Sequence, residues 1–299
     1  MTSQAHAEVE SRAVDIWSNG IRLSGDLWYP SDLKKGEKLP AIILCNGWSG
    51  TRKFTNRLAA PDFAKAGYVV LSFDYKGWGD SNSRLVVQGK MPKPDSEGMV
   101  AVTAKAIRGV VDAADHREDI ISAIDFMYGE PMVDNKRIGL WGTSMGGGHA
   151  LYVTAHDRRV KCLVSQVGSI AKNTTTPDWL WPLAAQQARG EIEPIPTSGK
   201  RLGNLPGIPH WAKIVPKSAG NYVDQIKVPT LIISAEEEEF DSNKKHHGDR
   251  IFRYLTEKNI PVRHEVFDCK HFEIYSGEFT RKAIALEIEW YDKYLKGKK

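Results

Sequence analysis

The sequence predicts an α/β protein in which a mostly parallel central sheet is covered by helices on both faces. Continuous apolar runs, typical of strands buried on both faces, alternate along the chain with stretches of helical apolar spacing. One of these runs, residues 137–142, ends two residues before a serine that stands between two glycines. The 299 residues are enough for one large domain of this class, which we expect to span 1–299.

The first part of the chain is expected to begin with a hairpin and to continue with buried strands. Polar and apolar residues alternate on both sides of Asn19-Gly20, a dipeptide that favours a tight turn. Residues 39–46 and 68–75 are continuous apolar runs and are expected to be strands, with a helix at 58–67 between them. Residues 79–115 contain two prolines and several glycines, followed by an alanine- and valine-rich run that we expect to be helical.

The remaining elements are expected to alternate between helix and strand. Some segments show apolar residues at helical spacing, and the others are short continuous apolar runs. On this basis we expect helices at 116–129, 149–157 and about 278–295, and strands at 137–142, 160–168, 228–235 and 262–268.

Composition and charge exclude several classes of function. The chain is 41% hydrophobic and 26% charged, and its formal net charge of +4 is small for its length, so no nucleic-acid partner is predicted. No apolar run approaches the roughly 20 residues that span a bilayer, and the polar N-terminus lacks the apolar segment of a secretory signal. Three separated cysteines, Cys45, Cys162 and Cys269, are expected to be buried thiols of a cytoplasmic protein. No metal-ligand cluster or phosphate-binding glycine loop is visible, so no cofactor is implied.

The stretch "LWGTSMGGGHA", residues 140–150, places Ser144 between Gly142 and Gly146. A preceding strand and a following helix are the context in which the G-x-S-x-G pattern presents a serine as a nucleophile. The sharp turn forces the serine into a strained backbone conformation, and its small neighbours relieve the crowding. The alternative interpretation is a glycine-rich corner that only lets strand and helix approach closely.

A serine hydroxyl needs a base to become nucleophilic at neutral pH, and the base needs an acid to orient it. In sheets of this type the chain order is serine, acid, histidine. His271 follows the last expected strand by a few residues, in a loop that would lie over the sheet edge. His149 and His156 are on the helix directly after Ser144 and cannot fold back onto it. His271 is therefore the expected base.

The acid is expected after the strand at 228–235, where the sequence supplies five carboxylates. A common arrangement in such enzymes has a small residue at the end of the strand and the acid three positions later. With Ala235 as the small residue, the acid is Glu238. The other carboxylates of the run stay open as alternatives, and these are Glu236, Glu237, Glu239 and Asp241.

An oxyanion that develops on the substrate needs two backbone N–H donors. One donor is expected from Met145, the residue after the nucleophile. The other is expected from Trp48 in the loop "CNGWSG", residues 45–50, where Gly47 permits a tight turn. The alternative for this loop is a simple glycine turn.

Residues 169–227 form a long connection with little regular pattern, three tryptophans and seven prolines. Connections of that length are uncommon in a compact domain unless they are functional. We expect a cap insertion over the carboxyl ends of the strands, where open α/β sheets bind ligands, and the alternative is a surface excursion. The tryptophans of the insertion are candidates for substrate binding, and they are Trp179, Trp181 and Trp211.

Taken together, these segments resemble the α/β-hydrolase fold, in particular its dienelactone-hydrolase-like and Xaa-Pro dipeptidyl-peptidase-like members. The resemblance covers nearly the whole chain and rests on "ILCNGWSG", "FDYKGWGDS", "DNKRIGLWGTSMGGG", "PTLIISAEEEE" and "KHFEIY", in the family's order. It implies Ser144 as nucleophile, Glu238 as acid and His271 as base, with the N–H groups of Trp48 and Met145 as the oxyanion hole. "GWGDS" takes the place of a structural turn, and we assign it no catalytic role.

Two features depart from the family pattern. The oxyanion loop has Asn46-Gly47 where the family has His-Gly, a change that should leave the backbone donor in place. The acid stands in an Ala-x-x-Glu setting rather than Gly-x-x-Asp, which bears on the acid more than on the serine. Dienelactone hydrolases themselves use a cysteine nucleophile, so Ser144 argues against that activity.

We therefore expect acyl transfer from a small-molecule substrate to water through a serine-bound intermediate. Carboxylic ester hydrolysis is the first choice because esters need the least help with the leaving group, and the cap tryptophans suggest an apolar or aromatic group in the pocket. Thioesterase, acyltransferase and small peptidase or amidase activities are alternatives. A non-catalytic binding protein of the same fold is an alternative of another class, although such proteins typically lose the serine, the histidine or the oxyanion loop. Homo-oligomer formation stays open.

Overall fold

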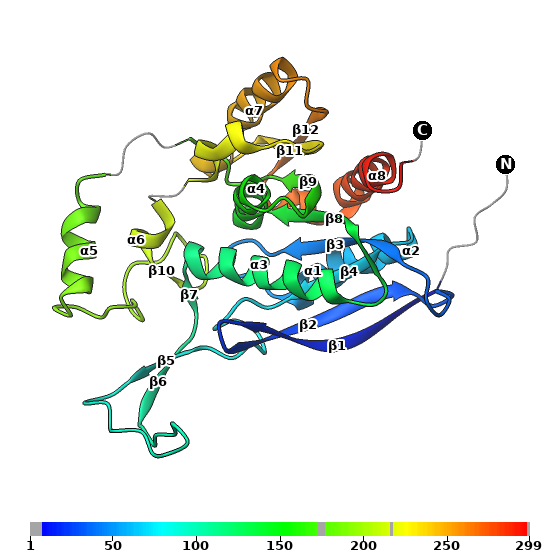
Figure 1. Ribbon diagram of the computed structural model, residues 1–299. Coiled ribbons are helices and arrows are strands. Elements are labelled where there is room, and N and C mark those ends of the chain that lie inside the picture. Colours follow the sequence, from blue (N-terminus) through cyan, green and yellow to red (C-terminus); the bar gives the residue numbers. More distant parts are fainter. Residues whose placement is uncertain (1–7, 173–176, 216–217, 298–299) are drawn as a thin grey trace, which may run out of the picture.

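A computed structural model describes residues 8–172, 177–215 and 218–297 of the protein, so the N-terminal residues 1–7 lie outside the described part. At its centre is an eight-stranded sheet (Figure 1). In spatial order its strands are β1 (Val9–Ser18), β2 (Ile21–Pro30), β4 (Val69–Phe73), β3 (Leu39–Cys45), β8 (Val133–Thr143), β9 (Val160–Gln166), β11 (Thr230–Glu237) and β12 (Val262–Lys270).

The pairing directions match the predicted sheet. β2 pairs antiparallel with β1 and with β4, whereas every neighbouring pair from β4 to β12 is parallel. The first two strands form the predicted hairpin, in which Asn19 and Gly20 have φ angles of 48° and 77°. Positive φ at both central residues is what a tight hairpin turn requires, and Asn-Gly meets that need at low cost.

Helices cover both faces of the sheet, and each face has its own apolar core (Figure 1). On one face lie α3 (Ala113–Gly129), α4 (Met145–His156) and α7 (Lys245–Glu257). On the other lie α1 (Arg52–Leu58), α2 (Ala60–Lys65) and α8 (Gly277–Tyr294). The predicted class, an α/β protein with a mostly parallel sheet between two helical layers, is confirmed.

The single helix expected at 58–67 is wrong in detail, because two short helices, α1 and α2, meet there. Ala59 separates them with φ −143° and ψ −32°, outside the helical region. Pro61, in the first turn of α2, has no N–H to donate to a preceding turn. A proline is tolerated where a helix begins, so the chain stops one helix and starts another.

The helical run expected towards the end of 79–115 is also wrong, since the chain there forms strands. β5 (Arg84–Val87) pairs antiparallel with β6 (Ala104–Ile107), and a two-residue strand, β7 (Val110–Val111), follows. Gly109 separates β6 from β7 with a φ of 68°. The β5–β6 hairpin projects from the body as an arm (Figure 1). A helix in this position would therefore have few tertiary contacts to stabilise it.

In the described parts of the connection between β9 and β11, the elements are short. They are α5 (Leu180–Ala188), β10 (Ile208–Pro209), α6 (Trp211–Ile214) and the 3-10 helix η2 (Ala219–Gln225). β10 pairs in parallel with β7, and the His210 N–H donates to the carbonyl of Val111 at 2.9 Å. Figure 1 shows α5 and α6 on the opposite side of the molecule from both termini. Within the described ranges no helix has the length and apolar character to cross a membrane.

Candidate active site

Ser144 stands at the sharp turn between β8 and α4, with φ 54° and ψ −127°. This conformation is strained for a residue with a side chain and recurs at functional sites. A Cβ added to Gly142 would overlap the carbonyl oxygen of Gly146, and one added to Gly146 would overlap that of Cys45. Only glycine fits on either side of Ser144, as the G-x-S-x-G pattern predicts.

The backbone around Ser144 is fixed by hydrogen bonds to β9 and to the loop that follows it. The Ser144 N–H donates to the Gln166 carbonyl at 2.9 Å, and the Ser144 carbonyl accepts from Ser169 N–H at 2.9 Å. A Cβ at Gly148 would overlap the Ser169 carbonyl oxygen, so the start of α4 lies directly against this loop. The serine is thus held rigidly at the carboxyl end of the sheet.

His271 lies between Ser144 and Glu238 and contacts both. Its Nε2 is 3.1 Å from Ser144 Oγ, and its Nδ1 is 2.8 Å from Glu238 Oε2. Glu238 follows β11 directly and His271 follows β12, and these two strands are parallel neighbours. Because the carboxyl ends of parallel strands meet at one edge of a sheet, loops far apart in sequence bring the three side chains together.

Burial separates Glu238 from the neighbouring carboxylates. The side chains of Glu238 and His271 are each 1% exposed, and Glu238 Oε1 accepts the Phe240 N–H at 3.0 Å. Glu236, Glu237, Glu239 and Asp241 are exposed. Lys245 pairs with Glu236, and Lys244 pairs with Asp241 at 2.7 Å. Glu239 contacts the backbone of His271 and not its ring, since Glu239 Oε2 accepts the His271 backbone N–H at 3.1 Å.

Aromatic rings enclose the imidazole. The ring centroids of Phe240 and Phe272 lie 4.8 Å and 5.0 Å from that of His271, both edge-on. Tyr275 is a third neighbour, and its hydroxyl is 2.9 Å from Thr143 Oγ1 in the residue before Ser144. Burial is the main cause that raises the pKa of Tyr275 well above its ordinary value, so this hydroxyl stays neutral.

The loop after β3 lies directly against the serine. A Cβ at Gly47 would stand 3.1 Å from Ser144 Cβ, which shows how close the two backbones come. Asn46 is buried, and its Nδ2 donates to the Phe73 carbonyl at 2.8 Å, tying the loop to β4. Within the described part of the chain, the N–H groups of Trp48 and Met145 make no hydrogen bond. Both predicted donors therefore remain available to a ligand.

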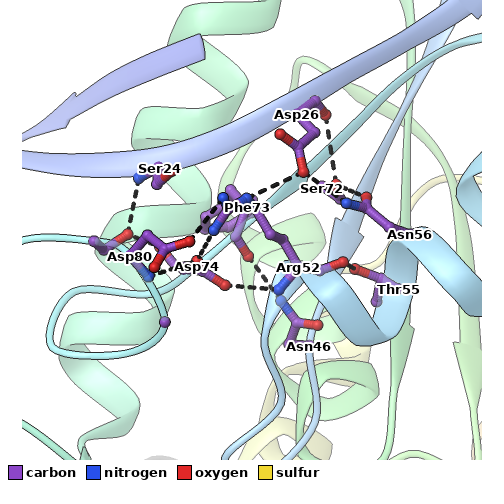
Figure 2. Close-up of polar contacts among 12 residues, drawn as sticks. Ser24, Asp26, Asn46, Arg52, Thr55, Asn56, Ser72, Phe73, Asp74 and Asp80 are labelled. Atoms are coloured by element: carbon purple, nitrogen blue, oxygen red, sulfur yellow. Dashed lines mark hydrogen bonds and ion pairs between the residues drawn. The ribbon is translucent and has the colours of Figure 1, made fainter. Parts of the chain in front are cut away.

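The helix that follows this loop begins in a network of charges (Figure 2). The Arg52 N–H donates to Asp74 Oδ1 at 2.7 Å, and its guanidinium contacts Asp74, Asp26 at 3.1 Å and Asp80 at 2.9 Å. Asn56 Nδ2 also donates to Asp26, at 2.6 Å. Sequence reasoning missed this network, because its members come from three separate segments: β2, α1 and the stretch after β4.

The turn "GWGDS" after β4 belongs to the same network. A Cβ at Gly79, where φ is 48°, would overlap the Asp74 carboxylate, and Ser81 Oγ donates to the Asp74 carbonyl at 2.7 Å. The turn therefore wraps around a buried carboxylate of the scaffold. Its contacts are structural, and Asp74 and Ser81 do not line the pocket at Ser144.

A pocket of about 790 Å³ opens over Ser144. Its lining comes from the loop after β3, the loops that carry Glu239 and His271, helices α3 and α4, and the connection between β9 and β11. That connection contributes mostly apolar residues, among them Leu202, Leu205, Trp211, Ile214 and Val215, together with Ser169 and Ser218. Trp211 also meets Trp48, with ring centroids 6.4 Å apart, and the Trp48 indole donates to the Pro206 carbonyl at 2.9 Å.

Two of the three tryptophans predicted to bind substrate lie elsewhere. Trp179 and Trp181 are 54% and 59% exposed, and neither lines the pocket. They flank Leu180 at the start of α5, and Leu180 is the residue that turns inward. The prediction is corrected here for Trp179 and Trp181, because tryptophan content alone does not indicate which side of a short helix is buried.

Three further residues near the pocket were not predicted as functional. Arg117 and His149 line it, and His116 Nδ1 lies 3.3 Å from His149 Nε2. Tyr75 stacks on His116 at 4.1 Å between ring centroids. Burial lowers the pKa of His116 to about 3 and that of His149 well below its usual range, so both rings are neutral at pH 7. Among the described residues no group of three histidine, cysteine or acidic side chains is placed to hold a metal.

Two family models match the chain over more than half of its length. The X-Pro dipeptidyl-peptidase family (S15) matches residues 19–190, and the prolyl oligopeptidase family matches residues 112–298. An uncharacterized 31.7 kDa protein of the traX-finO intergenic region of Escherichia coli is 26% identical, with 86% of this chain and 92% of that protein covered. The quorum-quenching protein AidA of Acinetobacter baumannii is 25% identical, with 93% of each chain covered.

Solved structures share the fold. The alpha/beta hydrolase GrgF from Penicillium superposes with a TM-score of 0.66 at 16% identity, covering 96% of this chain and 99% of that one. The hypothetical protein PA2218 from Pseudomonas aeruginosa gives a TM-score of 0.65 at 19% identity, with 99% of each chain covered. At these identities the likeness establishes the fold alone. The chemistry is inferred from the residues of the site in this chain.

Proposed function

This chain belongs to two overlapping families of α/β-hydrolases, the X-Pro dipeptidyl-peptidase family S15 and the prolyl oligopeptidase family, and we propose that it hydrolyses carboxylic esters through an acyl intermediate on Ser144. Membership makes it a serine hydrolase of the peptidase-like type. The ester substrate and the roles of individual residues are the proposal. The observation that supports them best is the continuous hydrogen-bonded chain from Glu238 through His271 to Ser144.

In the proposed reaction, Ser144 Oγ attacks the ester carbonyl carbon while His271 Nε2 takes the hydroxyl proton. Glu238 accepts the Nδ1–H of the imidazole, which fixes the tautomer that leaves Nε2 free to act as a base. The negative charge that develops on the carbonyl oxygen is stabilised by the N–H groups of Trp48 and Met145. His271 then donates its proton to the departing alcohol.

The second half of the cycle repeats these roles with water. A water molecule attacks the acyl carbon, His271 takes its proton, and the bond from carbon to Ser144 Oγ breaks. The proton returns to Ser144 Oγ and the carboxylic acid leaves. Phe240 and Phe272 pack edge-on against the imidazole, and the His271 side chain is only 1% exposed, so bulk water has little access to the proton-transfer path.

Esters are preferred over amides because an alkoxide leaves with less protonation than an amine. The largely apolar lining contributed by the connection between β9 and β11 suits an apolar or aromatic group of the substrate. We further propose that this connection, 169–227, acts as a cap over the site, as its contribution to the pocket wall suggests. Its residues 173–176 and 216–217 lie outside the described part of the chain.

A peptidase is the second candidate, and one observation favours it. Glu239 and Asp241 line the pocket, where carboxylates could bind a free amino terminus of a peptide. Asp241 is already paired with Lys244 at 2.7 Å, and Glu239 accepts the His271 N–H at 3.1 Å. We rank this candidate second because both carboxylates are engaged. Thioester and acyl-transfer reactions use the same machinery as ester hydrolysis and are tested with it.

We also propose a cytoplasmic location. Cys45, Cys162 and Cys269 are buried free thiols, as is usual where the environment is reducing. Burial raises the pKa of Cys269 to about 11, so this thiol stays protonated and unreactive at neutral pH. A redox role for these residues is therefore not part of the proposal.

The test compares hydrolysis of p-nitrophenyl esters, from acetyl to decanoyl, by the natural protein, Ser144→Ala and the control Ser31→Ala. Ser31 is exposed and far from the site in the chain. We expect Ser144→Ala to lose about a thousandfold or more in kcat/KM and to lose labelling by a fluorophosphonate, while Ser31→Ala keeps both. Cleavage of a dipeptidyl-proline p-nitroanilide without ester hydrolysis would favour the peptidase. Equal activity of Ser144→Ala and the natural protein would remove Ser144 from the mechanism.

A further inference from the structure

One wall of the pocket carries a buried cation that the proposed reaction does not use. Arg117, on α3, lines the pocket and is only 7% exposed. Its guanidinium carbon lies 3.8 Å from the centre of the Tyr152 ring on α4, a contact that holds the plane of the guanidinium in place. Burial is the main cause that lowers the pKa of Arg117 to about 10.

The wall around Arg117 is built from small side chains, which leaves room for a ligand beside it. The two helices that meet at Arg117 contribute small residues to the pocket lining, Ala113 from α3 and Gly148 from α4. The lining also includes bulkier aromatic groups, such as Phe240 and Trp211. A largely apolar pocket with a cation beside small residues suits a ligand that has an apolar body and an anionic end.

His149 adds a neutral polar group to the same wall. Its Nε2 faces His116 Nδ1 at 3.3 Å, which leaves Nδ1 as the ring nitrogen for a ligand. Tyr75 stacks on His116 and contacts His149 edge-on, so the pair of imidazoles is held in position. Because both imidazoles are neutral, His149 Nδ1 can donate a hydrogen bond when His116 supplies the proton shared between the rings.

We propose that Arg117, assisted by His149, binds a carboxylate at the far end of the substrate's acyl chain. The inference rests on the proposed function and names its substrate class: esters whose acyl part is an apolar chain ending in a carboxylate, that is, half-esters of dicarboxylic acids. A planar carboxylate matches the two-pronged donor geometry of a guanidinium, and the contact is strongest where water is excluded.

We assign the carboxylate to the acyl part of the substrate, and not to the alcohol part, because of the elements that carry Arg117 and His149. In the proposed reaction the departing alcohol takes its proton from His271, which lies on the side of β12. Arg117 and His149 come from α3 and α4 instead, and α4 begins at Met145, one of the proposed oxyanion donors. Groups on this side face the part of the substrate that stays attached to Ser144.

The first experiment measures kcat/KM for pairs of p-nitrophenyl esters with the same chain, ending either in a methyl group or in a carboxylate. Hexanoyl and adipoyl form one pair, and octanoyl and suberoyl form another. The natural protein is expected to prefer the carboxylated member of at least one pair. Arg117→Gln should reduce that preference by about 10- to 100-fold, the range for loss of a charged hydrogen bond, and Arg117→Lys should reduce it less.

Arg57→Gln is the matched control, because Arg57 is an exposed arginine on α1 outside the pocket. It should leave the preference as in the natural protein, which shows that net charge alone does not set it. A preference that Arg117→Gln retains, or a natural protein that hydrolyses both members of every pair equally, would overturn the inference while the proposed ester hydrolysis stands.

A second measurement does not depend on turnover or on the folding of an Arg117 variant. Titration calorimetry on Ser144→Ala compares monomethyl adipate and monomethyl suberate with the neutral dimethyl esters. We expect at least one monoanion to bind about tenfold or more tightly than its dimethyl ester, and the gain to fall with added salt. Equal binding of anion and diester at both lengths contradicts the carboxylate site. If no ester is hydrolysed at all, the proposed function fails and this titration alone decides the inference.

Discussion

His210 and Asp112 form a buried pair that joins the connection between β9 and β11 to helix α3. His210 Nδ1 lies 2.8 Å from Asp112 Oδ2, and His210 Nε2 is 3.3 Å from Gln187 Oε1 on α5. Asp112 Oδ1 also caps α3, since it accepts the N–H of Ala114 at 2.9 Å. One carboxylate thus starts the helix that carries Arg117 and anchors the segment that carries Trp211.

Replacement of His210 by alanine should loosen that connection. Loss of one partner from a buried pair leaves the carboxylate of Asp112 uncompensated, so we expect about 3 kcal/mol less stability and a higher KM for apolar esters. Urea unfolding and steady-state kinetics measure the two effects. His246→Ala, at an exposed position on α7, is the control and should change neither. An unchanged KM in His210→Ala would show that the pair does not position the pocket wall.

The same pair predicts how stability responds to acid. Burial, the largest single influence, raises the pKa of Asp112, but the contact with His210 and the hydrogen bond from the Asp115 N–H act against it, and the net pKa is lowered. A lowered pKa in the folded state contributes stability above the unfolded value of about 3.9, and this stability is lost as the pH falls through the folded value. Asp112→Asn should therefore be less stable than the natural protein at about pH 6, and the difference should shrink at about pH 3. A difference that stays constant in urea unfolding would exclude this linkage.

The sequence predicted the features that depend on neighbouring residues or on strand order. Ser144 is marked by glycines two residues away on each side, and His271 by its place after the last strand. The structure brings both to one sheet edge with Glu238. The choice of Glu238 among five carboxylates rested on its distance from Ala235, and burial of this one side chain agrees with that choice.

Features that depend on distant partners were missed. Arg117 sits in an ordinary amphipathic helix, and only the packing of α3 against α4 places it in the pocket. Arg52 contacts Asp26 on β2 and two aspartates in the stretch after β4, and no local pattern connects these segments. Trp179 and Trp181 were assigned to the pocket on residue type, whereas the short helix α5 turns Leu180 inward. A pattern of residue types indicates whether a segment is a helix or a strand and in which order the elements follow. It does not indicate which side of a short helix in a long connection faces the protein interior.

Gly146, in the first turn of α4, gives a sharp test of the serine turn. A Cβ at Gly146 would overlap the carbonyl oxygens of Cys45 and Asn46, which are backbone atoms and cannot rotate away. Gly146→Ala should therefore lose about 1–3 kcal/mol or more of stability, along with labelling of Ser144 by a fluorophosphonate. Gly129→Ala is the matched control, since a Cβ there meets nothing within 4 Å. Full labelling of Gly146→Ala would mean that the turn relaxes without moving the serine.

Substitution of the carboxylates one at a time identifies the acid. Glu238→Gln keeps the shape of the side chain but removes the charge that orients His271, and we expect kcat to fall by about three to four orders of magnitude. Glu237→Gln changes an exposed side chain at the end of β11 and should keep the natural rate. Ester kinetics at saturating substrate compare the two. A large loss in Glu237→Gln with little change in Glu238→Gln would reassign the acid.

A buried carboxyl group on α8, one of the helices that cover the sheet, should make the protein less stable in alkaline solution. Glu287, on α8, is completely buried near Trp141, and burial raises its pKa to about 8. The unfolded chain ionises this group near pH 4.3, whereas the folded chain holds its proton up to about pH 8. Unfolding is therefore favoured progressively as the pH rises between these two values, and the effect levels off above the higher one.

Glu287→Gln removes the ionisation and keeps a side chain of the same shape. We expect it to gain a few kcal/mol over the natural protein at about pH 8, and to match it at about pH 4, where Glu287 is protonated in both states. Urea unfolding at a series of pH values measures the difference. Glu289→Gln, two residues further along α8 with a side chain 73% exposed, should show no such trend. A gain in Glu287→Gln that is the same at both pH values would come from packing, because ionisation contributes only where the two states hold different numbers of protons.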